Sequence, residues 1–526
     1  MTVAWDLDEL APFDGPARRR EIVEAERAIE QAELDPSDEA IERARTLAED
    51  LRYLGWAVLA CDGGDAGARW LAAQGEALVA RVEAAVARQD SKAEISRAIV
   101  AALDEHGPGS WRLLYKKLLG SRRVTLAERE VGASETFKAL LGSDRTTREA
   151  AWRGRVEAWA HERTTLAAAV SSLTGWRATV AAEAGHATPL DAVAERHRMQ
   201  RATLDGLVVA VRKSLPMLRR GHRALARVLG YEQFAPWDRL LTVPGGPRGL
   251  AIQDALDRIE GAMGRIVPSM GEFVRAAREG RWIDAREGSR RRPGAFCAPL
   301  ARFRTPRVFT TWGGDLVSMR ILCHELGHGH HYWSLRALPH ERSRSPLPLE
   351  ELPSTFCELA AARELAEGAV DGRAHRLQDL MYLCTSVLRL TQAHALECAF
   401  QEARREGRLS PERLDEITMR VADEWTGDAV RPNILPGSWA TLRHLYLEPF
   451  ASIPYVVSIC LALGLMAVRR GDPSGFAARY QALLESLGAS TVEEIVRVYF
   501  DSTPDALWTA ALAEIGHAVD ELEKVR

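Results

Sequence analysis

The stretch Cys323-His324-Glu325-Leu326-Gly327-His328 is the part of the sequence from which the rest can be interpreted. Residues four apart lie one turn above each other on an α-helix, so His324 and His328 can present two imidazoles to one metal ion while Glu325 faces the same cleft. The preceding residues have helix-compatible apolar spacing, and no proline interrupts residues 311–338. We therefore predict a metal-binding helix over residues 315–338.

A second acidic segment, Glu351-Leu-Pro-Ser-Thr-Phe-Cys-Glu358, follows the histidine pair. Zn²⁺ held by two neutral histidines takes a third protein ligand and keeps a fourth position open, and a carboxylate on a following helix supplies the third. We predict that helix over residues 351–367, with Glu351 and Glu358 on nearly the same face. Both are candidates for the third ligand. Zinc is the expected cofactor, although Mn²⁺ or Co²⁺ takes the same ligands.

Length, composition and charge limit the class of protein. With 526 residues, of which 46% are hydrophobic, the chain is expected to form two or three subdomains. The net charge of −4 gives no reason to expect a nucleic acid or an anionic membrane as a partner. The first residues lack the basic start and apolar run of a secretory signal, and the 7 scattered cysteines include no C-x-x-C pair. We expect a cytoplasmic location.

Most of the chain is expected to be helical, because apolar residues recur three and four positions apart. Such patterns cover residues 16–242, 250–267, 270–279, 375–409 and 480–526. The apolar stretch 453–468 contains Pro454, Ser458 and Gly464. It is shorter than the roughly 20 residues of a bilayer-spanning helix and reads as a buried helix.

A small β-sheet is expected just before the metal-binding helix. Residues 288–297 read as a turn leading into a short strand, and residues 307–312 have the β-branched and aromatic content of another. An exposed strand edge there would let an extended peptide pair with the protein, which makes Thr310, Thr311 and Trp312 candidates for substrate binding. A purely structural sheet fits the same residues.

Taken together, these residues resemble the thimet-oligopeptidase-like zinc metallopeptidases, family M3, and within them the oligoendopeptidase F type. The resemblance rests on His324 to His328 with a further His331, on the segment from Glu351 to Glu358, on Trp282-Ile-Asp284 and Gly294-Ala-Phe-Cys297, on His444 to Tyr455, and on Leu487-Gly-Ala-Ser-Thr491. It covers roughly the last 300 residues in order and spacing, whereas the first 200 or so agree mainly in being helical.

The resemblance implies a mainly α fold with two lobes around a deep substrate channel and a small sheet beside the active-site helix. It divides the chain into an N-terminal helical lobe, residues 1–200, and a catalytic region, residues 201–526, whose helices over 440–526 bind substrate. It also implies a zinc-dependent endopeptidase acting on oligopeptides, with neither nucleic acid nor membrane as a partner. The oligomeric state stays open.

Carried over residue by residue, the resemblance makes His324, His328 and Glu351 the Zn²⁺ ligands. Glu325 is the general base that takes a proton from zinc-bound water and later passes it to the leaving amine. Glu358 orients a ligand histidine through its free ring nitrogen. His331 has either that supporting role or a packing role.

The oxyanion site departs from the family pattern. The family stabilises the oxyanion with a histidine and tyrosines near the C-terminal apolar helix, and His444 and Tyr455 match that pattern. Ser452 stands where one family tyrosine is expected, and Ala451 where another is. Either His444 and Tyr455 act alone, Tyr446 substitutes, or the activity is weakened or altered. His444 and Tyr455 could also only cap and pack the helix.

Three alternatives stand beside a general peptidase. The first is a repurposed zincin that binds a peptide or cleaves one dedicated substrate, which the oxyanion-site departure motivates. The second is a helical scaffold without metal, which is disfavoured because a scaffold needs no ligand triad. The third is a metzincin, which is disfavoured because Ser334 stands where its third histidine would fall.

Overall fold

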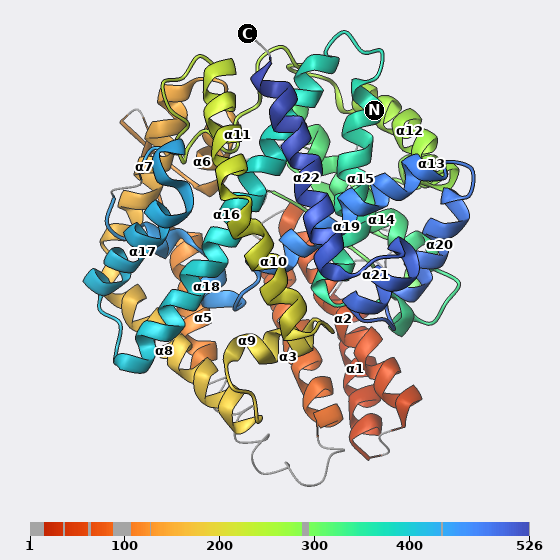
Figure 1. Ribbon diagram of the computed structural model, residues 1–526. Coiled ribbons are helices and arrows are strands. Elements are labelled where there is room, and N and C mark those ends of the chain that lie inside the picture. Colours follow the sequence, from red (N-terminus) through yellow and green to blue (C-terminus); the bar gives the residue numbers. More distant parts are fainter. Residues whose placement is uncertain are drawn as a thin grey trace.

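The computed structural model describes residues 15–34, 37–61, 65–87, 107–126, 128–286, 294–432 and 435–524. Helices dominate these residues, and the strands form two small sheets (Figure 1). The predicted mainly α fold is therefore confirmed. The turn expected at residues 288–293 lies outside the described residues.

The first three helices form one group that packs on the sheet near the metal-binding helix. They are α1 (Gly15–Leu34), α2 (Asp38–Cys61) and α3 (Ala66–Ala87). Their apolar faces enclose a separate core that also takes in Ala298 and Leu300. The buried carboxylate of Asp50 accepts hydrogen bonds from the backbone N–H groups of Ala301 and Arg302, at 3.0 and 3.1 Å.

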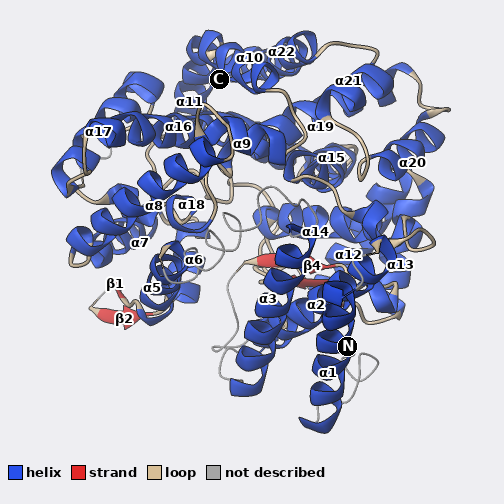
Figure 2. Ribbon diagram, turned by 90° about the horizontal axis from the view of Figure 1, so that it is seen from below, coloured by secondary structure: helices blue, strands red, loops and turns tan. Residues whose placement is uncertain are grey.

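A second group lies on the other side of the molecule (Figure 2). It contains α5 (Pro108–Ser121), β1 (Val124–Leu126), β2 (Arg129–Val131), α6 (Ala133–Leu141), α7 (Arg145–Ala160) and α8 (Arg163–Glu183). The antiparallel pair β1–β2 was not anticipated, because a helix was expected throughout this region. Glu128 has a φ of 65°, a left-handed turn conformation that ends the helical path and lets the chain reverse.

A layer of helices joins the two groups, as Figure 2 shows. Its members are α9 (Pro189–Arg196), α10 (Arg201–Lys213), α11 (Leu215–Val228), α16 (Gly372–Glu406), α17 (Pro411–Thr426), α19 (Ser452–Gly471), α20 (Phe476–Ser486), α21 (Val492–Phe500) and α22 (Pro504–Glu523). The main hydrophobic core runs through this layer into α14 and α15, the helices that carry the predicted metal ligands.

The remaining elements surround those residues. They are α12 (Ile252–Ile266), α13 (Pro268–Glu279), β3 (Ile283–Asp284), β4 (Ala295–Ala298), β5 (Arg307–Thr310), α14 (Leu316–Ser334), α15 (Leu347–Ala366) and α18 (His444–Leu447). Short 3₁₀ turns lie at Ala301–Phe303, His340–Ser343, Gly427–Ala429 and Ser438–Thr441. Pro268 separates α12 from α13, as the sequence predicts.

The three-stranded sheet has the order β3-β5-β4, with β3 parallel and β4 antiparallel to β5. The predicted strand 307–312 is therefore the central one, shortened to Arg307–Thr310. A central strand has both edges paired, so an extended peptide can add only to an outer strand. The edge available for such pairing thus does not belong to Thr310.

Helix α19 is the apolar helix predicted over residues 453–468. It is long and apolar enough to cross a membrane by length and composition, but 78% of its apolar window is buried inside the protein. The described helix lies against α15, α16 and α22. It is a core helix, as expected.

The division of the chain at residue 200 stays a prediction. Elements from both sides of that position pack together, since helix α2 lies against strand β5 and helix α8 lies against helix α16. The sequence division and the spatial groups in Figure 2 therefore differ in their boundaries.

Candidate metal centre

Helix α14 carries the histidine pair in its middle. Asp315 caps its N-terminus by accepting a hydrogen bond from the backbone N–H of Ser318 at 2.8 Å, while the Ser318 hydroxyl accepts from the N–H of Asp315. The helix begins one residue after the predicted start and ends at Ser334, four residues before the predicted end. His324, Glu325 and His328 lie in the interior of the helix, far from either end. Helical geometry therefore fixes their relative positions.

Helix α15 begins at Leu347, earlier than the predicted start at residue 351. Pro348 stands in the first turn of this helix, where a proline needs no partner for its missing N–H. Glu351 is therefore inside the helix, and Pro353 is an internal proline, not a first-turn residue.

The two helices touch where α14 has no side chain. A Cβ built on Gly327 would lie 2.6 Å from Cα of Ser354 and 2.8 Å from Cβ of Cys357. Glycine alone permits this approach, because any side chain would overlap the backbone of α15. The close contact brings Glu351 to the histidine pair.

Gly327→Ala is expected to destabilise the protein by about 1–3 kcal/mol, because the added methyl must push α14 and α15 apart. The same displacement should weaken metal binding. Thermal unfolding with and without added Zn²⁺ measures both effects. Gly261→Ala on α12 is the matched control: its Cβ would meet only Arg265 Nη1 at 3.6 Å, so its melting temperature should not fall. Equal behaviour of the two variants would contradict the tight contact.

The three predicted ligands come together. Nε2 of His324 lies 3.2 Å from Oε2 of Glu351, and Nε2 of His328 lies 3.6 Å from the same oxygen. The imidazole rings are 5.0 Å apart and nearly perpendicular. One donor atom from each residue falls within 4.8 Å of the others. The side chains are 21%, 12% and 11% exposed, so the cluster is open to solvent on one side.

This donor set fits a divalent cation. Among the described residues, Oε2 of Glu351 and Nδ1 of His328 are buried without a hydrogen-bond partner. Two imidazole lone pairs and a carboxylate oxygen facing one another repel unless a cation lies between them. Two histidines and one carboxylate, with one side open, are the donor set of a catalytic zinc site.

Glu325 lies beside the cluster and is 8% exposed. Burial raises the pKa of its carboxyl group, while the neighbouring His324 and His328 act in the opposite direction. For Glu351, burial opposes ionisation, but the same two histidines outweigh it and lower the pKa. The two carboxyl groups therefore differ: Glu351 is held as an anion, and Glu325 binds a proton more readily.

Glu358 reaches the other nitrogen of His324. Its Oε2 lies 3.2 Å from Nδ1 of His324, which fixes the ring and leaves Nε2 facing Glu351. Its Oε1 lies 3.0 Å from Nη2 of Arg320, and Nη1 of Arg320 donates to Asp379 at 2.7 Å. Arg320 and Asp379 were not predicted from the sequence. The spacing could have identified Arg320, because an arginine four residues before His324 lies on the same face of the helix.

His331 is fully buried, and neither ring nitrogen has a hydrogen-bond partner among the described residues. Burial lowers its pKa to about 3, so the ring stays neutral. It stacks on Tyr332 with 5.5 Å between ring centres. These contacts favour the packing role over contact with a ligand histidine.

Of the strand-end residues, Thr311 and Trp312 have local hydrogen-bond partners, whereas the hydroxyl of Thr310 has none among the described residues. Gly294 N–H donates to the hydroxyl of Thr311 at 3.1 Å, and the indole N–H of Trp312 donates to the carbonyl of Leu250 at 2.9 Å. Thr310 is fully buried. Their assignment to substrate binding stays a prediction. The outer strand β4, which carries Cys297, lies against α14.

The oxyanion candidates separate into two positions. Burial raises the pKa of the half-buried Tyr455, and the charge of Glu351 acts in the same direction. Tyr455 belongs to α19, which packs against α15, the helix that carries Glu351. Burial lowers the pKa of His444 to about 4, with Arg443 and Arg389 adding to the effect. Tyr446 is fully buried and stacks on Tyr115 with 4.1 Å between ring centres. Its hydroxyl is buried, which does not favour a substrate contact.

At the two positions that depart from the family pattern, the side chains are packed inside the protein. Ala451 and Ser452 are each 1% exposed at the start of α19, so neither presents a group to a substrate. Before them, Phe450 has a φ of 54°, which is unusual for a bulky residue. Its backbone N–H donates at 2.7 Å to Oε2 of Glu397, a buried residue of α16. Glu397 thereby holds the turn that leads to Tyr455.

Glu397 should make stability depend on pH. Burial raises its pKa from 4.5 to about 7. The folded protein therefore keeps a proton that the unfolded chain releases between pH 4.5 and 7, so stability falls as pH rises through this window, by on the order of 3 kcal/mol. Glu397→Gln is expected to be more stable than the native protein at pH 8 and similar to it at pH 4.5.

Thermal melts at several pH values measure this difference. Glu402→Gln, an exposed change on the same helix, should follow the native profile at every pH. A Glu397→Gln profile parallel to the native one would show that this carboxyl group does not titrate in the window.

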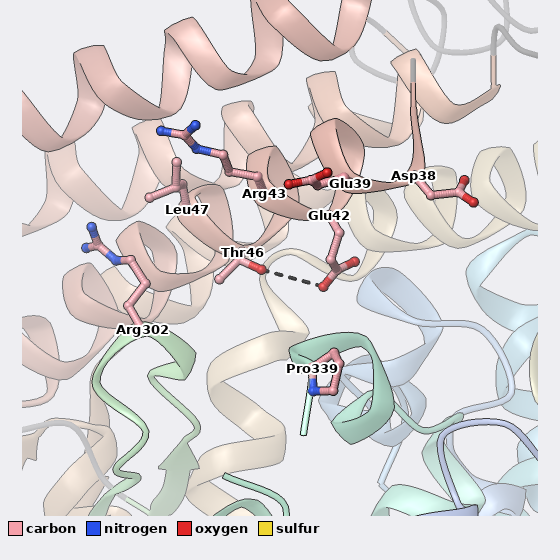
Figure 3. A pocket seen from close by; sticks show the side chains of 8 residues that line it. All are labelled: Asp38, Glu39, Glu42, Arg43, Thr46, Leu47, Arg302 and Pro339. Carbon is pink, nitrogen blue, oxygen red and sulfur yellow. Dashed lines mark hydrogen bonds between the residues drawn. The ribbon is translucent and has the colours of Figure 1, made fainter. Parts of the chain in front are cut away.

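The metal centre is distinct from a pocket between α2 and the segments around Arg302 and Pro339. Figure 3 shows that pocket, whose volume is about 570 Å³. Acidic and basic side chains of α2 line it, with the Thr46 hydroxyl donating to Glu42 at 3.5 Å. None of the predicted site residues is among the residues that line it.

Comparisons with known proteins place this geometry in a wider group. No protein-family model matches the chain. Oligopeptidase PepF of Bacillus subtilis is 21% identical over 411 residues, which are 76% of this chain and 60% of PepF. An oligoendopeptidase F homolog of Lactococcus lactis is 24% identical over 330 residues, 61% of this chain and 54% of the homolog. The matches thus span little more than half the length of these curated relatives.

The likeness in fold is more extensive. The crystal structure of oligoendopeptidase F from Enterococcus faecium matches 97% of this chain and 97% of its own, with a TM-score of 0.66 and 16% identity. Sequence and fold point to the same group of proteins. The chain is therefore similar to the oligoendopeptidase F type of the M3 metallopeptidases, as the sequence analysis expected.

Proposed function

We propose that this protein is a zinc-dependent endopeptidase that hydrolyses short peptides in the cytoplasm. One observation carries the proposal: Glu351 converges with His324 and His328 on a solvent-open site, and Glu325 stands beside them. The relatives named as oligopeptidases support peptide cleavage as the reaction class. The proposal keeps the predicted division of the chain, in which residues 201–526 form the catalytic region.

His324, His328 and Glu351 would hold the cation. When bound, a zinc ion polarises water and the scissile carbonyl. Glu325 accepts a proton at its carboxylate from the attacking water and delivers it to the leaving nitrogen. The buried position of Glu325 raises its affinity for that proton. Glu358 keeps the His324 ring in place through Nδ1, and Arg320 holds Glu358.

Tyr455 is the stronger candidate for oxyanion stabilisation. Its raised pKa keeps the hydroxyl protonated, as a hydrogen-bond donor must be, and its helix α19 packs against α15, which carries Glu351. His444 stays neutral near neutral pH and can also donate from one ring nitrogen. Both roles are part of the proposal.

The test is hydrolysis of a mixed oligopeptide library by the purified full chain, together with its metal content. Mass spectrometry of the products is expected to show internal cleavages and loss of them on chelation, with recovery when Zn²⁺ is returned. Cleavage that is indifferent to chelation would overturn the proposal.

A repurposed zincin is the second candidate. The buried Ala451 and Ser452 favour it, because they stand where the family has tyrosines. Fewer donors for the oxyanion therefore remain than in the family pattern. Stoichiometric metal with no cleavage of any library peptide would support this candidate over a general peptidase.

A further inference from the structure

Three helices meet beside His324 through one arginine. Arg320 lies one turn before His324 on α14 and contacts carboxylates of two other helices. Its Nη2 lies 3.0 Å from Oε1 of Glu358 on α15, and its Nη1 donates to Oδ1 of Asp379 on α16 at 2.7 Å. We call Glu358, Arg320 and Asp379 the buried triad.

The buried triad is shielded from solvent. Each of its three side chains is at most 8% exposed. The ring of Tyr382, three residues after Asp379 on α16, covers the guanidinium group, with 4.3 Å from the ring centre to the guanidinium carbon of Arg320. Removing one partner from a buried ion pair is costly, because water cannot take its place. The position of Arg320 is therefore set by α16 as well as by α15.

The charges within the buried triad do not cancel, because two carboxylates surround one guanidinium group. Arg363 approaches Asp379 from the outer side, with 3.9 Å between its Nε and Oδ2 of Asp379. Its side chain is 36% exposed and also lies 3.3 Å from Oε1 of Glu514 on α22. Water screens such a partly exposed pair. The buried triad thus keeps an excess of negative charge, which attracts a cation bound on the other side of the His324 ring.

Glu358 connects the buried triad to the predicted metal ligands. Its Oε2 lies 3.2 Å from Nδ1 of His324, and Nε2 of the same ring lies 3.2 Å from Oε2 of Glu351. When Nδ1–H of His324 donates to Glu358, Nε2 carries the lone pair that a metal needs. One oxygen of Glu358 faces His324 and the other faces Arg320. A shift of Arg320 would therefore let the Glu358 carboxylate turn and release the ring.

We propose that Asp379 and Arg320 are positioning residues for the metal centre, and that α16 sets the affinity for the cation through them. This inference rests on the proposed function, because it takes the three predicted ligands as the metal site. Asp379 holds Arg320, Arg320 holds Glu358, and Glu358 orients the ring of His324. Without Asp379 the whole charge of Arg320 acts on Glu358, which then attracts the Nδ1–H of His324 less strongly.

The affinity of the full chain for Zn²⁺ tests the proposal without relying on turnover. Competition against a chelator of known affinity measures it. Asp379→Asn is expected to bind Zn²⁺ about tenfold more weakly than the native protein, at the lower end of the effect of residues that orient a metal ligand. Arg320→Lys gives a second measurement from α14. Lysine keeps the charge but cannot bridge two carboxylates with a planar fork, so a similar loss is expected.

Glu364→Gln is the matched control on α15. Glu364 is also a buried carboxylate between two arginines, with 3.0 Å to Nε of Arg265 and 2.8 Å to Nη2 of Arg469. These pairs include no predicted metal ligand. Glu364→Gln should lower the melting temperature of the metal-free protein, because it breaks buried ion pairs. Its affinity for Zn²⁺ should stay within about threefold of the native value, since only the positioning residues act on the ligands.

Two further measurements separate positioning from a general loss of stability. If Asp379 acts through Glu358, adding Asp379→Asn to Glu358→Gln should weaken Zn²⁺ binding by less than about threefold more. Co²⁺ takes the same ligands as Zn²⁺, and its visible absorption bands report the ligand geometry. These bands should shift in Asp379→Asn, because the ring of His324 turns, and should match the native bands in Glu364→Gln.

Native Zn²⁺ affinity in folded Asp379→Asn or Arg320→Lys would overturn the inference. So would an equal loss in Glu364→Gln, losses that multiply in the double variant, or unshifted Co²⁺ bands in Asp379→Asn. In each of these cases the native protein still binds its metal, and the proposed function stands. A native protein that binds no Zn²⁺ would overturn the proposed function, and this inference with it.

Discussion

Glu325→Gln is expected to abolish peptide hydrolysis while the protein keeps its metal. Glutamine has nearly the shape of glutamate but cannot accept a proton, so the loss falls on proton transfer. A positioned general base contributes roughly 10²–10⁴-fold to the rate, and kcat/KM should fall by at least that factor. Glu325 is not one of the three converging ligands, so bound metal should stay at the native level.

The measurement combines kcat/KM on one library peptide with metal analysis of the same sample. Glu272→Gln on α13 is the control, since this exposed carboxylate should affect neither quantity. If Glu325→Gln cuts the peptide at the native rate, another group is the base. If it loses its metal, Glu325 is part of the ligand set.

Glu351→Gln is expected to lose metal. The amide is neutral and its oxygen is a weaker ligand, so affinity should fall by roughly 100-fold or more, beyond the 10–100-fold typical of a residue that only orients a ligand. Glu358→Gln should give the smaller loss, because Glu358 contacts His324 through Nδ1, on the side of the ring away from Glu351. Competition against a chelator of known affinity measures both variants.

The variant with the larger loss of metal affinity identifies the carboxylate that is the third ligand. The sequence alone leaves this choice open. Glu350→Gln, a change at the neighbouring position whose Oε1 accepts a hydrogen bond from Tyr332, should retain the metal. Zn²⁺ should also raise the melting temperature of the native protein and not that of Glu351→Gln. A larger loss in Glu358→Gln than in Glu351→Gln would reverse the assignment.

The parts of the site that follow from helical periodicity could be predicted. His324, Glu325 and His328 take their relative positions from one continuous helix, and Glu351 and Glu358 share a face of the next. Helix ends were less accurate: α15 begins earlier than predicted, because Pro348 can start a helix as well as interrupt a chain.

Contacts between distant segments could not be predicted in the same way. Arg320 pairs with Asp379, a residue 59 positions later, and nothing in the local pattern of either segment names the other. The segment that follows α11 is likewise held by distant residues, since Arg148 of α7 pairs with Asp238 and Gln378 of α16 donates to the carbonyl of Leu241. The β1–β2 pair was missed because a single turn residue, Glu128, decides it within a helical context.

The contact at Gly327 has a consequence for how the protein can evolve and move. The three predicted ligands and the proposed base lie on two neighbouring helices that meet backbone to backbone, so the candidate metal centre is one mechanical unit. The first helical group has a core of its own. Substitutions in that group can therefore accumulate without changing the affinity for the ion, and a movement of that group relative to α14 and α15 would leave the three ligands in place.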